Sequence, residues 1–248
     1  SRIWETLNLS TCADSSTNIN KKSPKLKPKN ILVKKDAAAL LTKKLKSRTW
    51  TGETIMLSGN TDCYQPAEKK YGITRQLLEV CLKYNQPVGI ITKNALICRD
   101  IDILKQLAEK NLVQVHLSIT TLDESLRRVM EPRTSTSANK LKTIALLSEA
   151  NIPVHVMLAP IIPGLNSDEV FSICEAVSKA GATSLNHTMV RLNGAIALLF
   201  EDWILKIFPL KATRVLNLIA QYFTQNSMKQ MSRRMILGRG TPSFFVHT

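Results

Sequence analysis

The sequence predicts an α/β fold in which parallel strands alternate with helices. Five apolar runs each end abruptly in polar residues, at 55–62, 88–94, 113–120, 154–160 and 185–191. Patterns typical of helices of about 10 to 15 residues separate the runs, and this alternation indicates βα units. Continuous apolar runs are typical of parallel strands that are buried on both faces. Because ligands bind beyond the carboxyl ends of such strands, the polar residues gathered there form the candidate site.

Length and composition agree with this fold class. The chain has 248 residues, of which 44% are hydrophobic, so it can bury a core as one domain. No stretch approaches the roughly 20 apolar residues of a membrane span, and no signal peptide is present, so we expect no membrane partner. The five cysteines show no CxxC spacing, which predicts reduced thiols in a cytoplasmic protein.

The net charge of +15 belongs to the two ends of the chain. Residues 1–50 contain 12 Lys and Arg against 3 Asp and Glu, residues 224–248 contain 4 against none, and residues 51–223 contain 18 against 16. We therefore predict a basic irregular segment at 1–30, a core at 31–223 and a basic tail at 224–248. The basic ends fit either solvated linkers or an arm that contacts phosphates.

Capping residues and apolar periodicity locate the remaining elements in order. A short strand is expected at 31–33. The predicted helices are 37–45 after Asp36, Thr74 to about Tyr84, 101–110 capped by Asp100, 123–130, 137–150, one opened by 167–169 and closed by Gly181, 200–208, and 213–223.

The strand ends carry groups suited to ligand binding. Residues 59–62 (Gly-Asn-Thr-Asp) combine close backbone approach with donors and an acceptor, which suits an amino group or a hydroxyl, or else a tight βα turn. Lys93 is placed either to pair with a carboxylate or as a surface lysine. Strand alternation puts Ser118 and Thr120 on one side, where both can reach a ligand.

Other polar residues have competing interpretations. Arg133, stiffened by Pro132, is a forked binder of carboxylates. His116 and His155 alternate with apolar residues and are expected to be interior histidines rather than metal ligands. Cys63 is placed either for thiol chemistry or as a small buried residue, and Arg99 is expected to be solvated.

The segment 58–68, Ser-Gly-Asn-Thr-Asp-Cys-Tyr-Gln-Pro-Ala-Glu, resembles the GGNTDPYQPxE block of radical S-adenosylmethionine (SAM) proteins related to spore photoproduct lyase. Further blocks follow in the order of that family, within roughly residues 31 to 223. They are 74–80, 91–93, 118–123, 130–133, 159–166 and 200–203.

The resemblance implies a partial (β/α)6 TIM-like barrel and a radical SAM enzyme of the lyase-like subgroup. In this family a CxxxCxxC loop holds a [4Fe–4S] cluster, SAM chelates its open iron, and an electron donor such as flavodoxin or ferredoxin drives reductive cleavage of SAM to a 5′-deoxyadenosyl radical. The implied cofactor contacts are Asn60, Thr61 and Asp62 with the amino end of SAM, Lys93 and Ser118 with its carboxylate end, Ala159 with its adenosyl part, and Arg133 as a second-rank polar contact.

Two departures from the family affect the expected activity. The chain contains no CxxxCxxC, so the first strand and the cluster loop are expected upstream of Ser1, and the chain as given is expected to be inactive. Gly59 stands where spore photoproduct lyase has a hydrogen-donating cysteine, so the substrate is unknown and a nucleic acid is one candidate. The alternative is a non-catalytic barrel remnant or a basic nucleic-acid-binding module.

Overall fold

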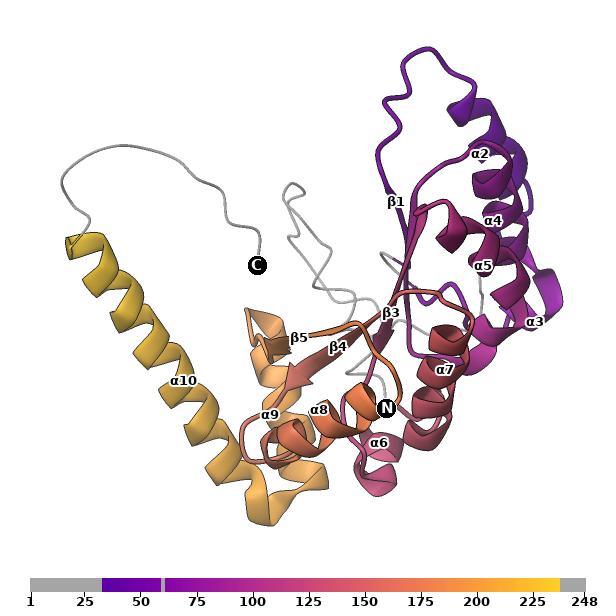
Figure 1. The fold of residues 1–248 in the computed structure, drawn as a ribbon. Helices are drawn as coiled ribbons and strands as arrows, with labels where there is room; N and C mark the ends of the chain where they lie inside the picture. Colours follow the sequence, from indigo (N-terminus) through magenta and orange to yellow (C-terminus); the bar gives the residue numbers. More distant parts are fainter. Residues whose placement is uncertain (1–32, 59–60, 237–248) are drawn as a thin grey trace. The chain divides into compact units, whose positions relative to one another are not determined.

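A computed structural model describes residues 33–58 and 61–236, with side chains described as far as residue 225. It contains one five-stranded sheet whose strands are all parallel and follow one another in chain order (Figure 1). The strands are β1 (Ile55–Leu57), β2 (Val88–Thr92), β3 (Val113–Ser118), β4 (Val154–Ile161) and β5 (Ser184–Met189). The predicted α/β class is therefore confirmed, and the sheet is consistent with a partial TIM-like barrel.

The chain divides into two compact units. The first contains the residues up to Ile161 together with Glu169–Met189, and the second contains Ile162–Asp168 and the residues from Val190 onward. The first unit holds the whole sheet. Its helices are α2 (Ala37–Leu45), α3 (Glu68–Tyr71), α4 (Ile73–Lys83), the 3-10 helix η1 (Ala95–Asp100), α5 (Ile101–Glu109), α6 (Glu124–Met130), α7 (Ser137–Glu149) and α8 (Val170–Lys179).

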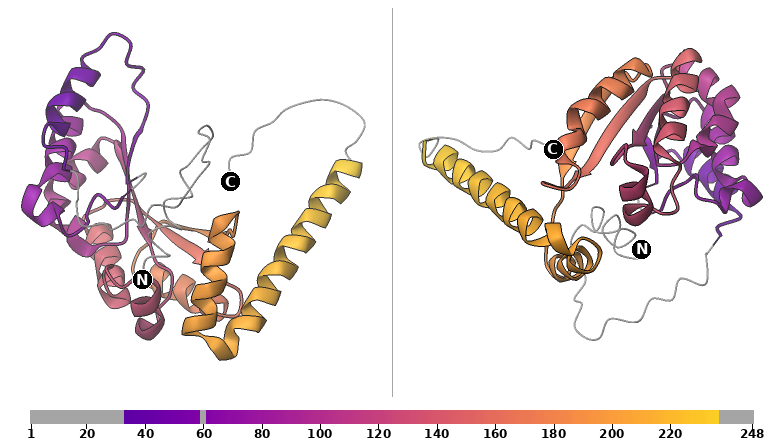
Figure 2. Two further views of the ribbon diagram at one scale, coloured as in Figure 1. Left: turned by 180° about the vertical axis from the view of Figure 1, so that it is seen from behind. Right: turned by 90° about the horizontal axis from the view of Figure 1, so that it is seen from below.

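The order of the strands determines where these helices lie. A right-handed crossover at every step from one parallel strand to the next places each connecting helix on the same face of the sheet. Figure 2 shows this arrangement, with the helices of the first unit on one face of the strands. The carboxyl ends of all five strands consequently meet at one edge.

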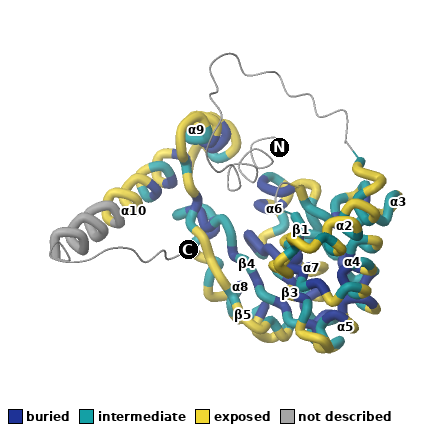
Figure 3. Tube along the Cα trace, turned by 90° about the horizontal axis from the view of Figure 1, so that it is seen from above, coloured by how far each residue is buried: buried dark blue, intermediate teal, exposed yellow. Residues whose placement is uncertain are grey.

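Register separates the sheet into two chemically different faces. Ile90 pairs with Val115 and Val115 with Val154, so these residues share the face that packs on the helices. All three are buried, and Figure 3 shows how burial concentrates in the strands and adjoining helices. On the opposite face, His116 pairs with His155. None of the five strands contains Asp, Glu, Lys or Arg, so every fully ionised side chain of the site comes from beyond a strand end.

Several helices begin differently from the sequence prediction. Helix α4 begins at Ile73, and the carboxylate of Glu68 accepts hydrogen bonds from the amides of Ile73 and Thr74, both at 3.0 Å. Asp100 does not cap α5 through its side chain, because that carboxylate pairs with two arginines. The short helix predicted at 123–130 is present as α6, and the side chain of Asp123 caps it by accepting from the amides of Ser125 and Leu126.

The described residues of the second unit include the loop from Ile162, the start of the 3-10 helix η2 (Ser167–Glu169) and two α-helices. The helices are α9 (Ala195–Ile207) and α10 (Pro209–Ile236), so both are longer than the predicted 200–208 and 213–223. Trp203 packs between Phe200 and Phe208, with ring centroids 5.6 and 5.8 Å away. At the amino end of the chain, the predicted strand at 31–33 lies mostly outside the described residues, and Val33 is not in a strand.

Candidate functional site

Lys93 follows β2 directly and is held by its backbone from two directions. Its amide donates to Oδ2 of Asp62 at 2.9 Å, and its carbonyl accepts from the amide of Ser135 at 3.3 Å. Ser135 also accepts from the amide of Ala95 at 2.8 Å, which ties the α6–α7 turn to the end of β2. These contacts fix the backbone of Lys93, so its side chain starts from a defined position at the carboxyl edge of the sheet.

The Lys93 ammonium forms an ion pair with Glu131, which belongs to the α6–α7 turn. Arg127 fixes the position of Glu131, because Nη1 donates to the carbonyls of Glu131 and Thr134, each at 3.1 Å. The Nε atom of Arg127 in turn donates to Glu124 at 2.7 Å. These hydrogen bonds hold the turn and favour a single position of Glu131 before any ligand binds.

Glu131 accepts from two lysines and a hydroxyl. Oε1 accepts from Lys93 and from Oγ1 of Thr120 at 2.9 Å, and Oε2 accepts from Nζ of Lys140 at 3.3 Å. The side chains of Glu131 and Lys140 are 2% and 1% exposed, whereas that of Lys93 is 16% exposed. Lys93 is thus the member of this cluster that a ligand can reach.

Burial and charge compete at Glu131. Burial raises the pKa of its carboxyl, but the positive charges of Lys93 and Lys140 and the hydrogen bonds from Lys93 and Thr120 outweigh it, lowering the pKa to about 2. Burial lowers the pKa of Lys140, and the charge of Glu131 opposes that shift. Glu131 is consequently ionised at neutral pH.

Asp62 organises the other side of the site. Oδ1 accepts from the amide of Tyr64 at 2.9 Å and from Oγ1 of Thr92 at 2.8 Å. Oδ2 accepts from the Lys93 amide and from Nδ2 of Asn94 at 3.1 Å. All four donors are uncharged, so dipoles solvate the negative charge of Asp62, and no cation among the described residues forms an ion pair with it.

Ser118 is a buried hydroxyl at the end of β3. It pairs in register with Met157, on the same face as His116 and His155. Its hydroxyl makes no hydrogen bond to another residue in the described part of the chain, whereas the neighbouring Thr120 donates to Glu131. An unsatisfied buried hydroxyl is costly, so this position favours a ligand that bonds it.

The other predicted contacts lie around this site to different degrees. Asn60 lies outside the described residues. Thr61 is exposed beside Asp62, and Ala159 lies on β4 with its carbonyl 3.4 Å from Oγ1 of Thr120. Arg133 is exposed in the α6–α7 turn. The structure therefore brings Asp62, Lys93, Ser118 and Ala159 to one edge of the sheet.

Neither Lys140 nor the anchoring role of Glu131 was predicted from the sequence. Lys140 lies on the buried side of α7 with Ser137, Ile144 and Leu147, at helical spacing. A lysine on the apolar face of a predicted helix was the signal that could have found it, since buried lysines need a charged partner. The partner itself, six residues before the helix begins, is visible only in the folded chain.

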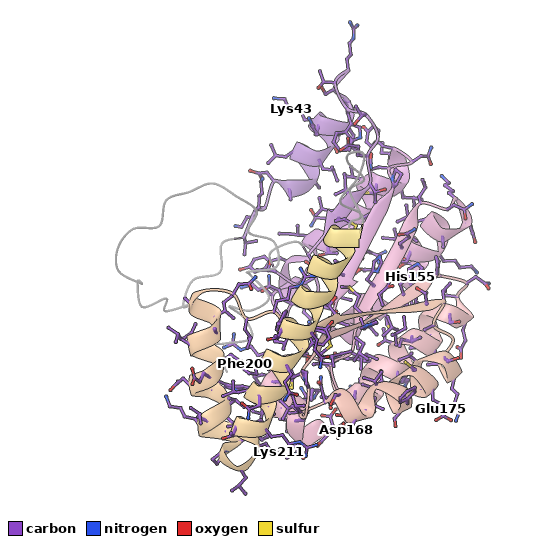
Figure 4. The ribbon with its side chains drawn as sticks, turned by 90° about the vertical axis from the view of Figure 1, so that its left-hand side faces the viewer. Lys43, His155, Asp168, Glu175, Phe200 and Lys211 are labelled. Carbon is purple, nitrogen blue, oxygen red and sulfur yellow. The ribbon has the colours of Figure 1, made fainter. Side chains whose placement is uncertain are left out.

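Three other predictions have clear outcomes. His116 and His155 are half-buried and not fully interior; their rings stack with centroids 5.1 Å apart, and Nδ1 of His155, labelled in Figure 4, lies 2.7 Å from Oγ of Ser184. Burial raises the pKa of the Cys63 thiol to about 12, which favours the interpretation as a small buried residue. The expectation that Arg99 is solvated is wrong, because its guanidinium pairs with Glu68 at 2.9 Å and Asp100 at 2.8 Å.

Iron–sulfur ligands are not found within the described ranges 33–58 and 61–236. No group of three or more His, Cys, Asp or Glu side chains there could hold a metal ion. The four described cysteines, Cys63, Cys81, Cys98 and Cys174, are free thiols on separate elements. In the same part of the chain, no helix is long and apolar enough to cross a membrane.

Comparison with known proteins gives the family. The sequence profile of the Radical SAM superfamily matches residues 12–177. Uncharacterized proteins of Mycobacterium tuberculosis and Mycobacterium bovis are each 30% identical over 181 residues, which is 72% of this chain and 53% of theirs. An uncharacterized protein of Acidianus two-tailed virus is 33% identical over 138 residues, 56% of this chain and 42% of its own.

The chain spans about half the length of the curated mycobacterial relatives it matches. The match to the superfamily profile nevertheless covers most of the chain, including four of the five strands and the Lys93 site. With its parallel sheet and its polar groups at the carboxyl edge, this chain belongs to the radical SAM superfamily.

Proposed function

We propose that the carboxyl edge of the sheet binds the amino-acid end of SAM. The observation that carries this proposal is that two donor groups lie at the ends of adjacent strands. They are the partly exposed ammonium of Lys93 and the buried hydroxyl of Ser118, which has no partner in the described residues. Lys93 would bind the carboxylate of SAM and Ser118 would hydrogen-bond the same end. Asp62 supplies a negative charge near Lys93, so the site has two poles, as an α-amino acid zwitterion requires.

The remaining family contacts extend the same proposal. Asn60 and Thr61 would assist Asp62 at the amino group, and Ala159 would lie against the adenosyl part of SAM. Arg133 would make a second-rank contact from the α6–α7 turn. The proposal rests mainly on Lys93 and Ser118, because the Lys93 ammonium is partly exposed and the Ser118 hydroxyl has no partner in the described residues.

For the whole protein we propose radical SAM chemistry of the spore photoproduct lyase-like type on an unidentified substrate. A bound [4Fe–4S] cluster would supply the electron that cleaves SAM, itself reduced by flavodoxin or ferredoxin. The described residues do not fit such a cluster, so its thiolates would have to come from outside them. A nucleic acid is one candidate substrate, and the reduced thiols support a cytoplasmic location.

A non-catalytic SAM-binding remnant is the second candidate, and the lack of cluster ligands in the described residues favours it. A basic module that binds nucleic acid rests on the charged ends at 1–30 and 224–248, and those boundaries, with the core at 31–223, stay a prediction. Neither the remnant nor the module would catalyse a reaction. The remnant would still bind SAM at Lys93, whereas the module would not.

Titration of SAM into the 248-residue chain, followed by protein NMR, tests the proposed site. We expect Lys93→Ala to weaken binding by at least about tenfold, because it removes the cation opposite the carboxylate. Ser118→Ala should weaken it by about fivefold, the value of one hydrogen bond. Lys105→Ala is the matched control, since Lys105 is an exposed lysine on α5 and should bind SAM like the parent.

The outcome that contradicts the proposal is equally direct. If Lys93→Ala and Ser118→Ala both bind SAM as the parent does, the amino-acid end of SAM lies elsewhere. If the parent binds a duplex or single-stranded oligonucleotide but no SAM, the basic module replaces the SAM site as the function of this chain.

A further inference from the structure

The cluster behind Lys93 contains one more cation than the ion pair requires. Glu131 forms an ion pair with both Lys93 and Lys140, and Lys140 has no other ion pair in the described part of the chain. Arg127, whose charge also acts on Lys140, is itself paired with Glu124 at 2.7 Å. With all three groups ionised, as in the two ion pairs, the three-residue cluster of Lys93, Glu131 and Lys140 carries a net charge of +1.

An excess charge of this kind is unfavourable where it is buried. Lys140 is 1% exposed, so water does not solvate its ammonium, and a single carboxylate serves two cations. A ligand with one negative charge beside Lys93 would bring the cluster to neutrality. Lys140 is too deeply buried to touch that ligand, so its influence must pass through Glu131.

We propose that Glu131 and Lys140 are positioning residues that set the charge at Lys93, so that the site selects a ligand bearing one carboxylate. The inference rests on the proposed function, because it takes Lys93 as the contact of the SAM carboxylate. Because Glu131 forms ion pairs with both lysines, its single negative charge does not fully compensate the positive charge of the Lys93 ammonium. Without Lys140, Glu131 would neutralise Lys93 fully.

Substitutions of similar shape change the charge of the cluster one step at a time. Lys140→Met lowers the net charge from +1 to 0. The double variant Glu131→Gln, Lys140→Met returns it to +1, carried by Lys93 alone. Glu131→Gln by itself removes the anion from both lysines, and the buried Lys140 should then lose its proton, which again leaves about +1.

Two nucleosides isolate the carboxylate end of the ligand. S-adenosylhomocysteine and 5′-methylthioadenosine share adenosine and a thioether, and only the first has an amino acid end. Both are titrated into the parent and the three variants of the 248-residue chain at neutral pH, with NMR as the readout. Far-UV circular dichroism and thermal unfolding verify that each variant is folded.

We expect Lys140→Met to weaken S-adenosylhomocysteine binding by about tenfold and to leave 5′-methylthioadenosine unchanged. The double variant should recover the parent affinity for S-adenosylhomocysteine within about twofold, and Glu131→Gln should bind it at least as well as the parent. A merely structural role predicts the opposite order, with the double variant weakest.

The results that overturn the inference are separate from those that overturn the proposed site. Undiminished binding by Lys140→Met, or a double variant as weak as that single variant, would overturn the inference alone. If Lys140→Met does not fold, the double variant and Glu131→Gln decide, and loss of binding in either rejects the inference. A parent that binds both nucleosides equally would reject the Lys93 site and this inference together.

Discussion

Glu131 is a buried carboxylate whose ionisation depends on two lysines. Its pKa is lowered from 4.5 to about 2 because Lys93, Lys140 and Thr120 overcome the effect of burial. A pKa that is lower in the folded than in the unfolded chain adds stability above the unfolded value, and that stability is lost as the pH falls through the folded value. Glu131 should therefore link folding to pH in the range from about 4.5 down to about 2.

We predict that the parent loses about 3 kcal/mol of unfolding free energy to this group alone between neutral pH and about pH 2. Glu131→Gln should lack that portion of the acid dependence, although it is less stable at neutral pH. Urea unfolding at several pH values measures both curves. Glu109→Gln, at an exposed glutamate, is the control and should follow the parent, and parallel curves for Glu131→Gln would contradict the assignment.

Cys63 gives a second prediction for a single residue. Burial raises the pKa of its thiol to about 12, and that of Cys81 to about 11, so almost no thiolate is present near neutral pH. We expect iodoacetamide to alkylate Cys63 and Cys81 slowly in the native chain and rapidly in urea. Peptide mass mapping distinguishes the sites, and native labelling of Cys63 at the rate seen in urea would restore it as a candidate for thiol chemistry.

At the scale of elements, carboxylates hold the loop between β1 and α4 in addition to the packing of its Tyr64 in the apolar core. Glu68 accepts from two amides at the start of α4 and pairs with Arg99, while Asp62 joins the loop to the end of β2. The carboxylate of Asp100 is completely buried. It accepts a hydrogen bond from the hydroxyl of Tyr64 at 3.1 Å and forms ion pairs with Arg75 and Arg99. The loop that carries Thr61 and Asp62 is thereby tied to β2 and η1.

Glu68→Ala should cost about 2 kcal/mol of unfolding free energy, because two amides and the Arg99 guanidinium lose an acceptor in a buried setting. Chemical unfolding measures the change. Glu109→Ala, which removes an exposed glutamate near the end of α5, should change stability by less than about 0.5 kcal/mol. Equal effects of the two substitutions would show that Glu68 does not stabilise the loop.

At the scale of the whole molecule, the described part of the chain has the parallel sheet of a radical SAM fold but no group of side chains that could hold an iron–sulfur cluster. The full sequence contains five cysteines, and no two of them have the spacing of CxxxCxxC. A [4Fe–4S] cluster requires thiolates that converge on one site. The four described cysteines lie on different elements and cannot provide them.

We therefore expect the 248-residue chain to retain no stoichiometric iron or sulfide after anaerobic reconstitution and desalting. Metal analysis and the visible absorption spectrum check this result. A chain that retains iron and sulfide equal to one [4Fe–4S] cluster would contradict it. Replacement of each cysteine by serine would then identify the ligands.

The sheet could be predicted because its determinants are local in the sequence. Each strand is a short apolar run bounded by turn residues, and right-handed crossovers restrict neighbouring parallel strands to chain order. The same reasoning placed Lys93 and Ser118 at one edge, as the structure confirms. Helix ends were less accessible, since Glu68 caps α4 from outside it and Asp100 is drawn away by two arginines.

By itself the sequence determined the α/β class, the strand order and the edge at which polar residues collect, because periodicity and chain connectivity act over a few residues. Only the tertiary structure decided what those polar residues do. Glu131 lies 38 residues from Lys93 and 9 from Lys140, and their mutual contact depends on how the α6–α7 turn packs on β2. Charge pairing between distant segments follows from distance and burial in the folded chain, neither of which the order of residues along the chain specifies.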